Sequence, residues 1–227
     1  MRHAGLLLVI AFAFVSPSLA QLRPSSADID GYRGMLAAAA RDDAAAIASL
    51  AAGGARLDER DAHGRTPLLV AAHLGRHAAM QRLAQLGADA NALDADRYDA
   101  VTIAAVANDV ATLRVALALG TRATNVTSRY DGTALIAAAH LGHVDVVREL
   151  IRAGAPLDHV NNLGWTALIE SIVLGDGGPR HVATLQALID AGANPNLPDR
   201  QGTTPLALAR GRGYAPMVAI LQRAGAR

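Results

Sequence analysis

Hydrophobic residues along the chain gather in short helix-like segments that glycine interrupts at regular intervals. After residue 143, for example, Val144, Val147, Leu150 and Ile151 fall three or four positions apart, the spacing of one buried helix face. A glycine follows the later segment of each pair, at Gly54, Gly87, Gly120, Gly154, Gly192 and Gly225, in steps of 33, 33, 34, 38 and 33 residues. This period predicts a repeat in which each unit reads cap, helix, turn, helix, glycine and loop.

Two further columns keep the same period. Residues that can cap a helix precede the first helix of five units, namely Thr66, Asp99, Thr133, Thr166 and Thr204. Their side-chain oxygens can accept an unpaired backbone amide at the helix start. Alanine pairs recur within the first helices, at 38–39, 71–72, 104–105 and 138–139. We expect these small residues to let neighbouring helices approach closely, and we expect the glycine column to end each second helix in a left-handed conformation.

Two segments carry a resemblance to a known family. Asp61–Asp94 reads DAHGRTPLLVAAHLGRHAAMQRLAQLGADANALD, and Asp131–Asp158 reads DGTALIAAAHLGHVDVVRELIRAGAPLD. Both resemble the ankyrin repeat, over six units at about 30–60, 61–94, 95–128, 129–161, 162–199 and 200–227. The resemblance implies an all-α ankyrin-repeat solenoid of helix–turn–helix units with β-hairpin fingers, one domain over residues 30–227. The third unit is degenerate, with Asp99 as cap and Asn108 at the turn glycine, and Asp176–Arg180 is an insertion in the fifth.

The first twenty residues have the pattern of a secretory signal peptide. A short positive start, Met1–His3, precedes an apolar run, Ala4–Val15, and a small-residue region, Ser16–Ala20. We expect cleavage after Ala20, a short linker over 21–29, and a periplasmic or secreted bacterial protein without a stable membrane anchor; an uncleaved anchor is the alternative. All 21 basic Lys+Arg residues are Arg, which suggests a GC-rich bacterial genome.

Composition narrows the possible functions. The chain has no Cys, which excludes disulfides, thiol chemistry and a lipid-anchored N-terminus. Removal of Arg2 with the signal leaves 20 Arg against 20 Asp+Glu, and this neutral balance argues against nucleic-acid binding. We expect a monomer stabilised by packing between neighbouring repeats.

Catalytic and metal-binding patterns are missing from the sequence. There is no Gly-x-Ser-x-Gly elbow, and Gly175–Pro179 is glycine-rich but lacks the lysine of a phosphate-binding loop. His73 and His140 share one column two units apart, too distant to hold one ion. We therefore predict no enzyme activity, no catalytic residues, no metal and no cofactor.

Two surfaces are candidates for binding a protein partner. The first is the set of finger residues Tyr32, Arg65, Tyr98, Tyr130 and Trp165, which are residue types that dominate interface hot spots. The alternative is that these side chains pack between neighbouring fingers and seal the stack. The second surface is the concave face, predicted from His73, Leu74, Val106, His140, Leu141 and Leu174. In the family, ligands usually lie across both surfaces.

These features predict a non-enzymatic protein–protein interaction scaffold that binds a protein partner through its fingers and concave face. Three other roles stay open: an inhibitor or immunity protein for an exported toxin or enzyme, a stress-protection accessory, and a secreted effector. Each uses the same scaffold, and fold alone does not choose between them.

Overall fold

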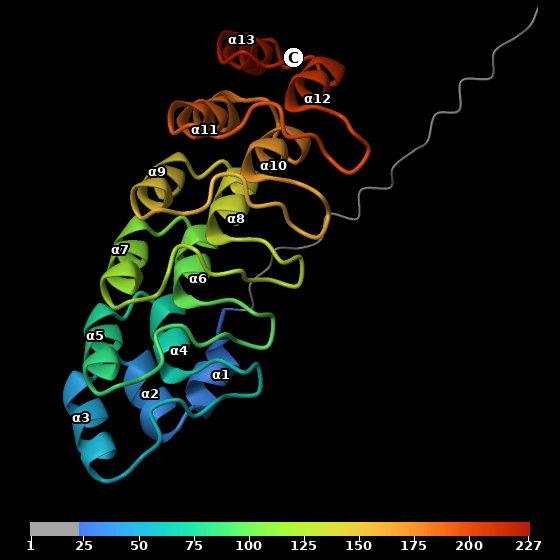
Figure 1. Ribbon diagram of the computed structural model, residues 1–227. Coiled ribbons are helices and arrows are strands. Elements are labelled where there is room, and N and C mark those ends of the chain that lie inside the picture. The colour runs from blue at the N-terminus through green and yellow to red at the C-terminus, as the bar shows by residue number, and fades with distance from the viewer. Residues whose placement is uncertain (1–22) are drawn as a thin grey trace, which may run out of the picture.

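The computed structural model describes residues 23–227, which form thirteen helices in a curved stack (Figure 1). Helix α1 (Ser26–Gly31) precedes six helical pairs, and the first helix of each pair lies on the same side as the projecting loops. The first helices are α2 (Gly34–Ala40), α4 (Pro67–His73), α6 (Ala100–Val106), α8 (Ala134–Leu141), α10 (Ala167–Val173) and α12 (Pro205–Gly211). The second helices are α3 (Ala44–Ala52), α5 (His77–Gln85), α7 (Val110–Ala118), α9 (Val144–Arg152), α11 (Pro179–Asp190) and α13 (Ala215–Arg223). Within this range no helix has the length and hydropathy needed to cross a membrane.

The predicted cap and glycine columns form the helix ends. Thr66 accepts the amide of Leu69 at 3.3 Å, and Asp99 replaces threonine by accepting the amide of Thr102 at 2.7 Å. All six glycines of the column have positive φ, between +79° and +99°. Asn108 takes φ +56° at the turn of the degenerate unit, which asparagine tolerates better than most residues.

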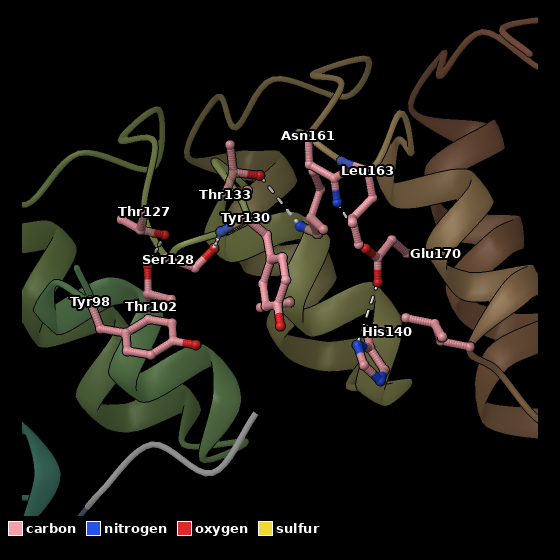
Figure 2. A pocket seen from close by; sticks show the side chains of 14 residues that line it. Tyr98, Thr102, Thr127, Ser128, Tyr130, Thr133, His140, Asn161, Leu163 and Glu170 are labelled. Carbon is pink, nitrogen blue, oxygen red and sulfur yellow. Dashed lines mark hydrogen bonds and ion pairs between the residues drawn. The ribbon is translucent and has the colours of Figure 1, made fainter. Parts of the chain in front are cut away.

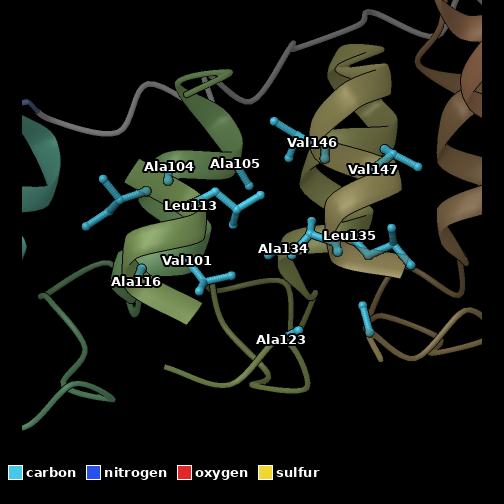
Figure 3. Close-up of a cluster of buried hydrophobic side chains, with 14 of the residues drawn as sticks. Val101, Ala104, Ala105, Leu113, Ala116, Ala123, Ala134, Leu135, Val146 and Val147 are labelled. Atoms are coloured by element: carbon cyan, nitrogen blue, oxygen red, sulfur yellow. The ribbon is translucent and has the colours of Figure 1, made fainter. Parts of the chain in front are cut away.

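Alanine forms much of the contact between neighbouring first helices. The four alanine pairs are at most 4% exposed, and α4, α6 and α8 pack in succession along the stack. In the central units, Leu113 of α7 lies beside Ala104 and Ala105, and Leu135 of α8 lies beside Ala134 (Figure 3). The small side chains bring the helix backbones close together, and larger residues such as leucine fill the remaining space.

The fingers are tight hairpin loops closed by a column of Asp and Asn that the sequence reading missed. Asp61, Asp94, Asn161 and Asp199 each stand five residues before a cap and accept two backbone amides of their own loop at 2.8–3.0 Å. A carboxylate or amide oxygen at this spacing folds the loop back on itself. Within residues 23–227 a β-bridge forms only between Thr127 and Gly132, so the fingers are loops rather than extended ribbons.

The N-terminal part of the described chain is helical where a linker was expected. Ser25 and Asp28 form a capping box at the start of α1. Ile29 of this helix packs on the cluster that contains Val70, as does Leu74, and the Arg23 guanidinium donates to the His73 carbonyl at 2.9 Å. Helix α1 therefore covers the concave side of the first two units. The predicted signal peptide, residues 1–20, lies outside the described residues.

The insertion in the fifth unit packs against the sixth. Its last two residues lengthen the start of α11, while Asp176 accepts the amide of Gly178 at 2.8 Å and pairs with His181 at 2.7 Å. The ring of Tyr214 lies over Gly177, and its hydroxyl donates to the Gly175 carbonyl at 3.0 Å. The extra residues thus fix the last unit onto the stack.

Candidate partner-binding surface

Three of the five predicted finger residues are buried, which corrects the expectation that they project. Tyr32 and Tyr98 are each 7% exposed and Arg65 is 1% exposed. All three occupy the position directly before a cap. There the loop has already turned back toward the helices, so the side chain points into the stack. Their placement matches the alternative interpretation, in which they pack between units.

Arg65 is the centre of a buried polar network at the N-terminal end. Its guanidinium donates to Asp61 at 2.6 Å and to Asp28 of α1 at 3.1 Å, and the Tyr32 hydroxyl donates to Asp61 at 2.8 Å. Burial alone would raise the pKa of Asp61, but hydrogen bonds from Tyr32 and Arg65 hold it below its usual value. The network ties α1 to the first finger, so these residues have a structural role.

The outer surface of the fingers carries different apolar residues from those predicted. Tyr130 and Trp165 are half-buried. The large hydrophobic side chains exposed in residues 23–227 are Val126, Val160 and Leu163. All three stand on two neighbouring fingers, those of units four and five when each finger is assigned to the unit whose cap, Thr133 or Thr166, follows it. Apolar residues gathered in this way can form the core of an interface. The sequence could have indicated these three residues, because each is an apolar residue among the polar residues of a loop.

The predicted concave strip is divided into a covered part and an open part. His73 is 6% exposed and is therefore not available to a partner, which corrects its assignment, whereas Leu74 is half-buried and packs on the cluster that contains Val70. Burial, and secondarily the charges of Arg65 and Arg23, lower the pKa of His73 to about 4. The remaining residues of the strip are partly exposed: Val106, His140, Leu141 and Leu174.

A pocket opens in the uncovered part, between the fingers and the first helices of units four and five (Figure 2). The Tyr130 ring lies between Tyr98 and the His140–Glu170 pair (Figure 2). The lining is formed by Tyr98, Thr102, Thr127, Ser128, Tyr130, Gly132, Thr133, Ile136, Ala137, His140, Asn161, Leu163, Glu170 and Leu174. The pocket thus brings together predicted residues of both candidate surfaces, Tyr98 and Tyr130 from the fingers and His140 and Leu174 from the concave strip.

Glu170 is the residue of this pocket that the sequence reading did not single out. It is 4% exposed, its Oε1 accepts from the Asn161 amide at 2.9 Å, and its Oε2 lies 3.4 Å from His140 Nδ1. Burial raises the pKa of Glu170 to about 7, against the opposing effect of the Asn161 hydrogen bond. Burial also lowers the pKa of His140, with a smaller contribution from His181. Near neutral pH the histidine is therefore neutral, and the carboxyl group is only partly ionised.

The pocket chemistry fits binding rather than metal coordination. The described part of the chain contains no group of three or more His, Asp or Glu side chains placed to hold a metal ion. Hydroxyl groups, two aromatic rings and one carboxyl group instead line a mainly apolar wall. Such a combination can hold an amphipathic group in one orientation.

Comparisons with known proteins agree with the architecture. The family model of ankyrin repeats in three copies matches residues 101–199, and the single ankyrin repeat matches residues 63–92. YahD of Escherichia coli (strain K12), which is named as an ankyrin repeat protein, is 34% identical over 192 residues, 84% of this chain and 95% of its own length.

Solved structures show the same likeness. An ankyrin repeat domain from Acinetobacter baumannii AYE is 43% identical with a TM-score of 0.79, covering 85% of this chain and 98% of that one. The ankyrin repeat domain of Bcl-3, a member of the IkappaB family, is 29% identical with a TM-score of 0.77, covering 87% and 88%. The chain belongs to the ankyrin-repeat family.

Proposed function

We propose that the protein is a non-enzymatic scaffold that binds a protein partner across the fingers and open concave face of units three to five. The main support is that Val126, Val160 and Leu163 are exposed, and that all three stand on the two neighbouring fingers that also supply residues to the pocket lining. The ankyrin-repeat family supports the proposal further, because its members typically mediate protein binding. Because a rigid stack holds such a surface in place, the surface does not have to become ordered when a partner binds. This limits the entropic cost of association.

We also propose that the protein acts in the periplasm or outside the cell. This proposal rests on the sequence of residues 1–20, with its positive start, apolar run and small residues before Gln21. Fractionation of the producing bacterium, followed by N-terminal sequencing of the protein, tests it. A mature chain that starts at Gln21 outside the cytoplasm is expected, whereas full-length protein in the cytoplasm would contradict it.

The binding surface is tested by comparing one charge in two places. Val160→Asp adds a carboxylate to the exposed finger, and Ala111→Asp adds the same group to an exposed position of α7 on the opposite side of the stack. Tagged protein is used to capture partners from the cell envelope fraction, and captured proteins are quantified by mass spectrometry. We expect Val160→Asp to lose partners that wild type and Ala111→Asp retain. Equal capture by all three would place the interface elsewhere.

A further inference from the structure

The pocket of units four and five exists because the fourth unit lacks a side chain that its neighbours have. Directly before the cap, the flanking units carry Tyr98 and Trp165, but the fourth carries Gly132. A Cβ atom at Gly132 would meet Ser128 Oγ at 3.5 Å and Ile136 Cγ2 at 3.7 Å, which is ordinary contact. The φ angle of this glycine is not positive, so its backbone would accept a side chain. The space is therefore left by the absence of a side chain at Gly132, since the backbone there does not itself require glycine.

Glu170 is a second departure at the same place. It stands four residues after its cap, where the other units carry Val70, Ile103, Ala137 and Leu208. The finger above it departs in a matching way, because its loop-closing residue is Asn161 where units two, three and six have an aspartate. Only an amide can close the loop with its oxygen and also donate to the carboxylate, as Asn161 does at 2.9 Å. Glu170 is thus an acceptor held in place by Asn161, and its other oxygen lies 3.4 Å from His140 in the lining of the pocket.

The charge of Glu170 is poorly compensated within the described part of the chain. Its Oε2 atom lies 3.4 Å from Nδ1 of His140, and burial keeps that imidazole neutral near pH 7 by lowering its pKa. A buried carboxylate without a cation is costly, and an incoming cation would remove that cost. The walls suit the rest of such a group, because Ile136 and Leu163 are apolar and Tyr130 presents a ring. Aromatic rings attract cations, and lysine and arginine have long aliphatic stems.

We propose that this pocket receives a lysine or arginine side chain of the bound protein, with its cationic head at Glu170 and its stem along Tyr130 and Leu163. The inference rests on the proposed function for the source of the cation. It adds the chemistry that a partner must present: a basic side chain that projects from an apolar patch able to cover Val126 and Val160.

Small probes test the pocket without knowledge of the partner. n-Butylguanidinium, n-butanol and butyrate are short unbranched probes that differ in charge. Each is titrated into the folded protein at about pH 8, where a carboxyl group with a pKa of about 7 is mostly ionised. Binding is followed by NMR through the amides of Gly132 and Leu163. We expect n-butylguanidinium to bind about tenfold more tightly than n-butanol, and butyrate not to bind. Equal binding of the cation and the alcohol, or preference for butyrate, would overturn the inference.

Three variants show which residues cause the preference of the pocket for the cation. Glu170→Gln keeps the size of the side chain and should abolish the preference for the cation while leaving n-butanol binding unchanged. Gly132→Trp restores a ring before the cap and should remove binding of both. Should that variant fail to fold by circular dichroism, Leu163→Arg serves in its place. Leu163 is 37% exposed, so the substitution is tolerated and supplies a competing guanidinium at the pocket edge. Unchanged n-butylguanidinium binding by Glu170→Gln would refute the role of the carboxylate.

Partner capture separates this inference from the proposed function. One outcome is that partner capture is lost in Val160→Asp but persists in Glu170→Gln and in Leu163→Arg. That result would support the proposed scaffold function and refute the proposal that a basic side chain of the partner enters the pocket. Selective binding of n-butylguanidinium, together with capture that Val160→Asp leaves intact, would instead refute the proposed interface and retain the cation preference of the pocket.

Discussion

The two ends of the concave face use the same repeat position in opposite ways. His73 and His140 both stand seven residues after their caps, near the end of a first helix. His73 is 6% exposed, and Arg23, just before α1, donates to its carbonyl, whereas the side chain of His140 is 21% exposed and faces an open pocket. The backbone of the two units is alike. The difference comes from what lies above it, because α1 covers the first site and Gly132 leaves the second uncovered.

This comparison shows how a repeat protein separates stability from binding. At the covered end, Arg65 fills the position before the cap and joins α1 to the finger through two carboxylates. At the open end the same column contains Gly132, and a carboxyl group remains without a fixed cation. Because each repeat contacts mainly its neighbours, one unit can sacrifice local stability while the others keep the stack folded.

The largest effect should come from breaking the network of the covered end. Arg65→Met keeps most of the side-chain volume but leaves the carboxylates of Asp61 and Asp28 without their cation. We expect it to lower the free energy of unfolding by about 3–5 kcal/mol, the usual cost of breaking a buried ion pair. Urea denaturation followed by circular dichroism measures the change.

A matched control for this change lies on the surface of the next finger. Arg97 pairs with Asp131 at 2.8 Å, and both side chains are about half exposed, at 48% and 50%. Arg97→Met should therefore cost less than about 1 kcal/mol. Similar losses in the two variants would show that the covered end is not specially stabilised, and the contrast between the two regions would disappear.

The pH dependence of stability should have opposite signs at the two sites. His73 has a folded pKa of about 4, below the ordinary 6.5, so the unfolded state binds more protons between these values and stability falls as pH drops through them. Glu170 has a folded pKa of about 7, above the ordinary 4.5, so the folded state binds more protons and stability falls as pH rises from 4.5 to 7. Each contribution is about 3 kcal/mol.

Variants isolate these two contributions from the other titrating groups. His73→Leu should remove the loss on the acid side, and Glu170→Gln should remove the loss on the alkaline side. Urea melts of both variants and of wild type, at intervals across about pH 4 to pH 8, give the differences. Curves that stay parallel to wild type across the range would show that neither group titrates with a shifted pKa.

The match between Asn161 and Glu170 predicts a smaller effect with a clear signature. Asn161→Asp restores the residue found in units two, three and six but places two carboxyl groups in contact. We expect a loss of about 2 kcal/mol above neutral pH, from like charge and a lost hydrogen bond. In a Glu170→Gln background most of this loss should vanish, since the new amide can donate to the aspartate. A double-mutant cycle that shows no coupling would mean that Asn161 and Glu170 contribute to stability independently.

The sequence predicted the architecture well because each column expresses local physics. A threonine caps its own helix, a glycine ends its own helix, and an alanine pair meets the equivalent pair of the next unit. The direction of the side chain before the cap was predicted wrongly for Tyr32, Arg65 and Tyr98. That direction depends on how the loop folds back on its Asp or Asn, a column that was not recognised.

The pocket could have been found by comparing units rather than residue types. Attention to aromatic residues selected side chains that are mostly buried, whereas the informative signals were departures from the repeat. Gly132 is a small residue in a column of large ones, and Glu170 is an acid in an apolar column. The cover provided by α1 was beyond such a comparison, because it depends on how Ile29 and Arg23, outside the repeats, pack against unit two.

The smallest predicted effect tests that cover directly. Ile29→Ala removes part of the apolar contact of α1 with the cluster that contains Val70 and should cost about 1 kcal/mol, because Ile29 is only partly buried. The larger consequence is local: when α1 loosens, water reaches His73 and its pKa should rise from about 4 toward 6.5, while that of His140 stays unchanged. NMR titration of the two imidazole rings measures both in one sample. If His73 kept a pKa of about 4 in this variant, its burial would originate within the repeat stack itself, and α1 would not be what distinguishes the two ends of the concave face.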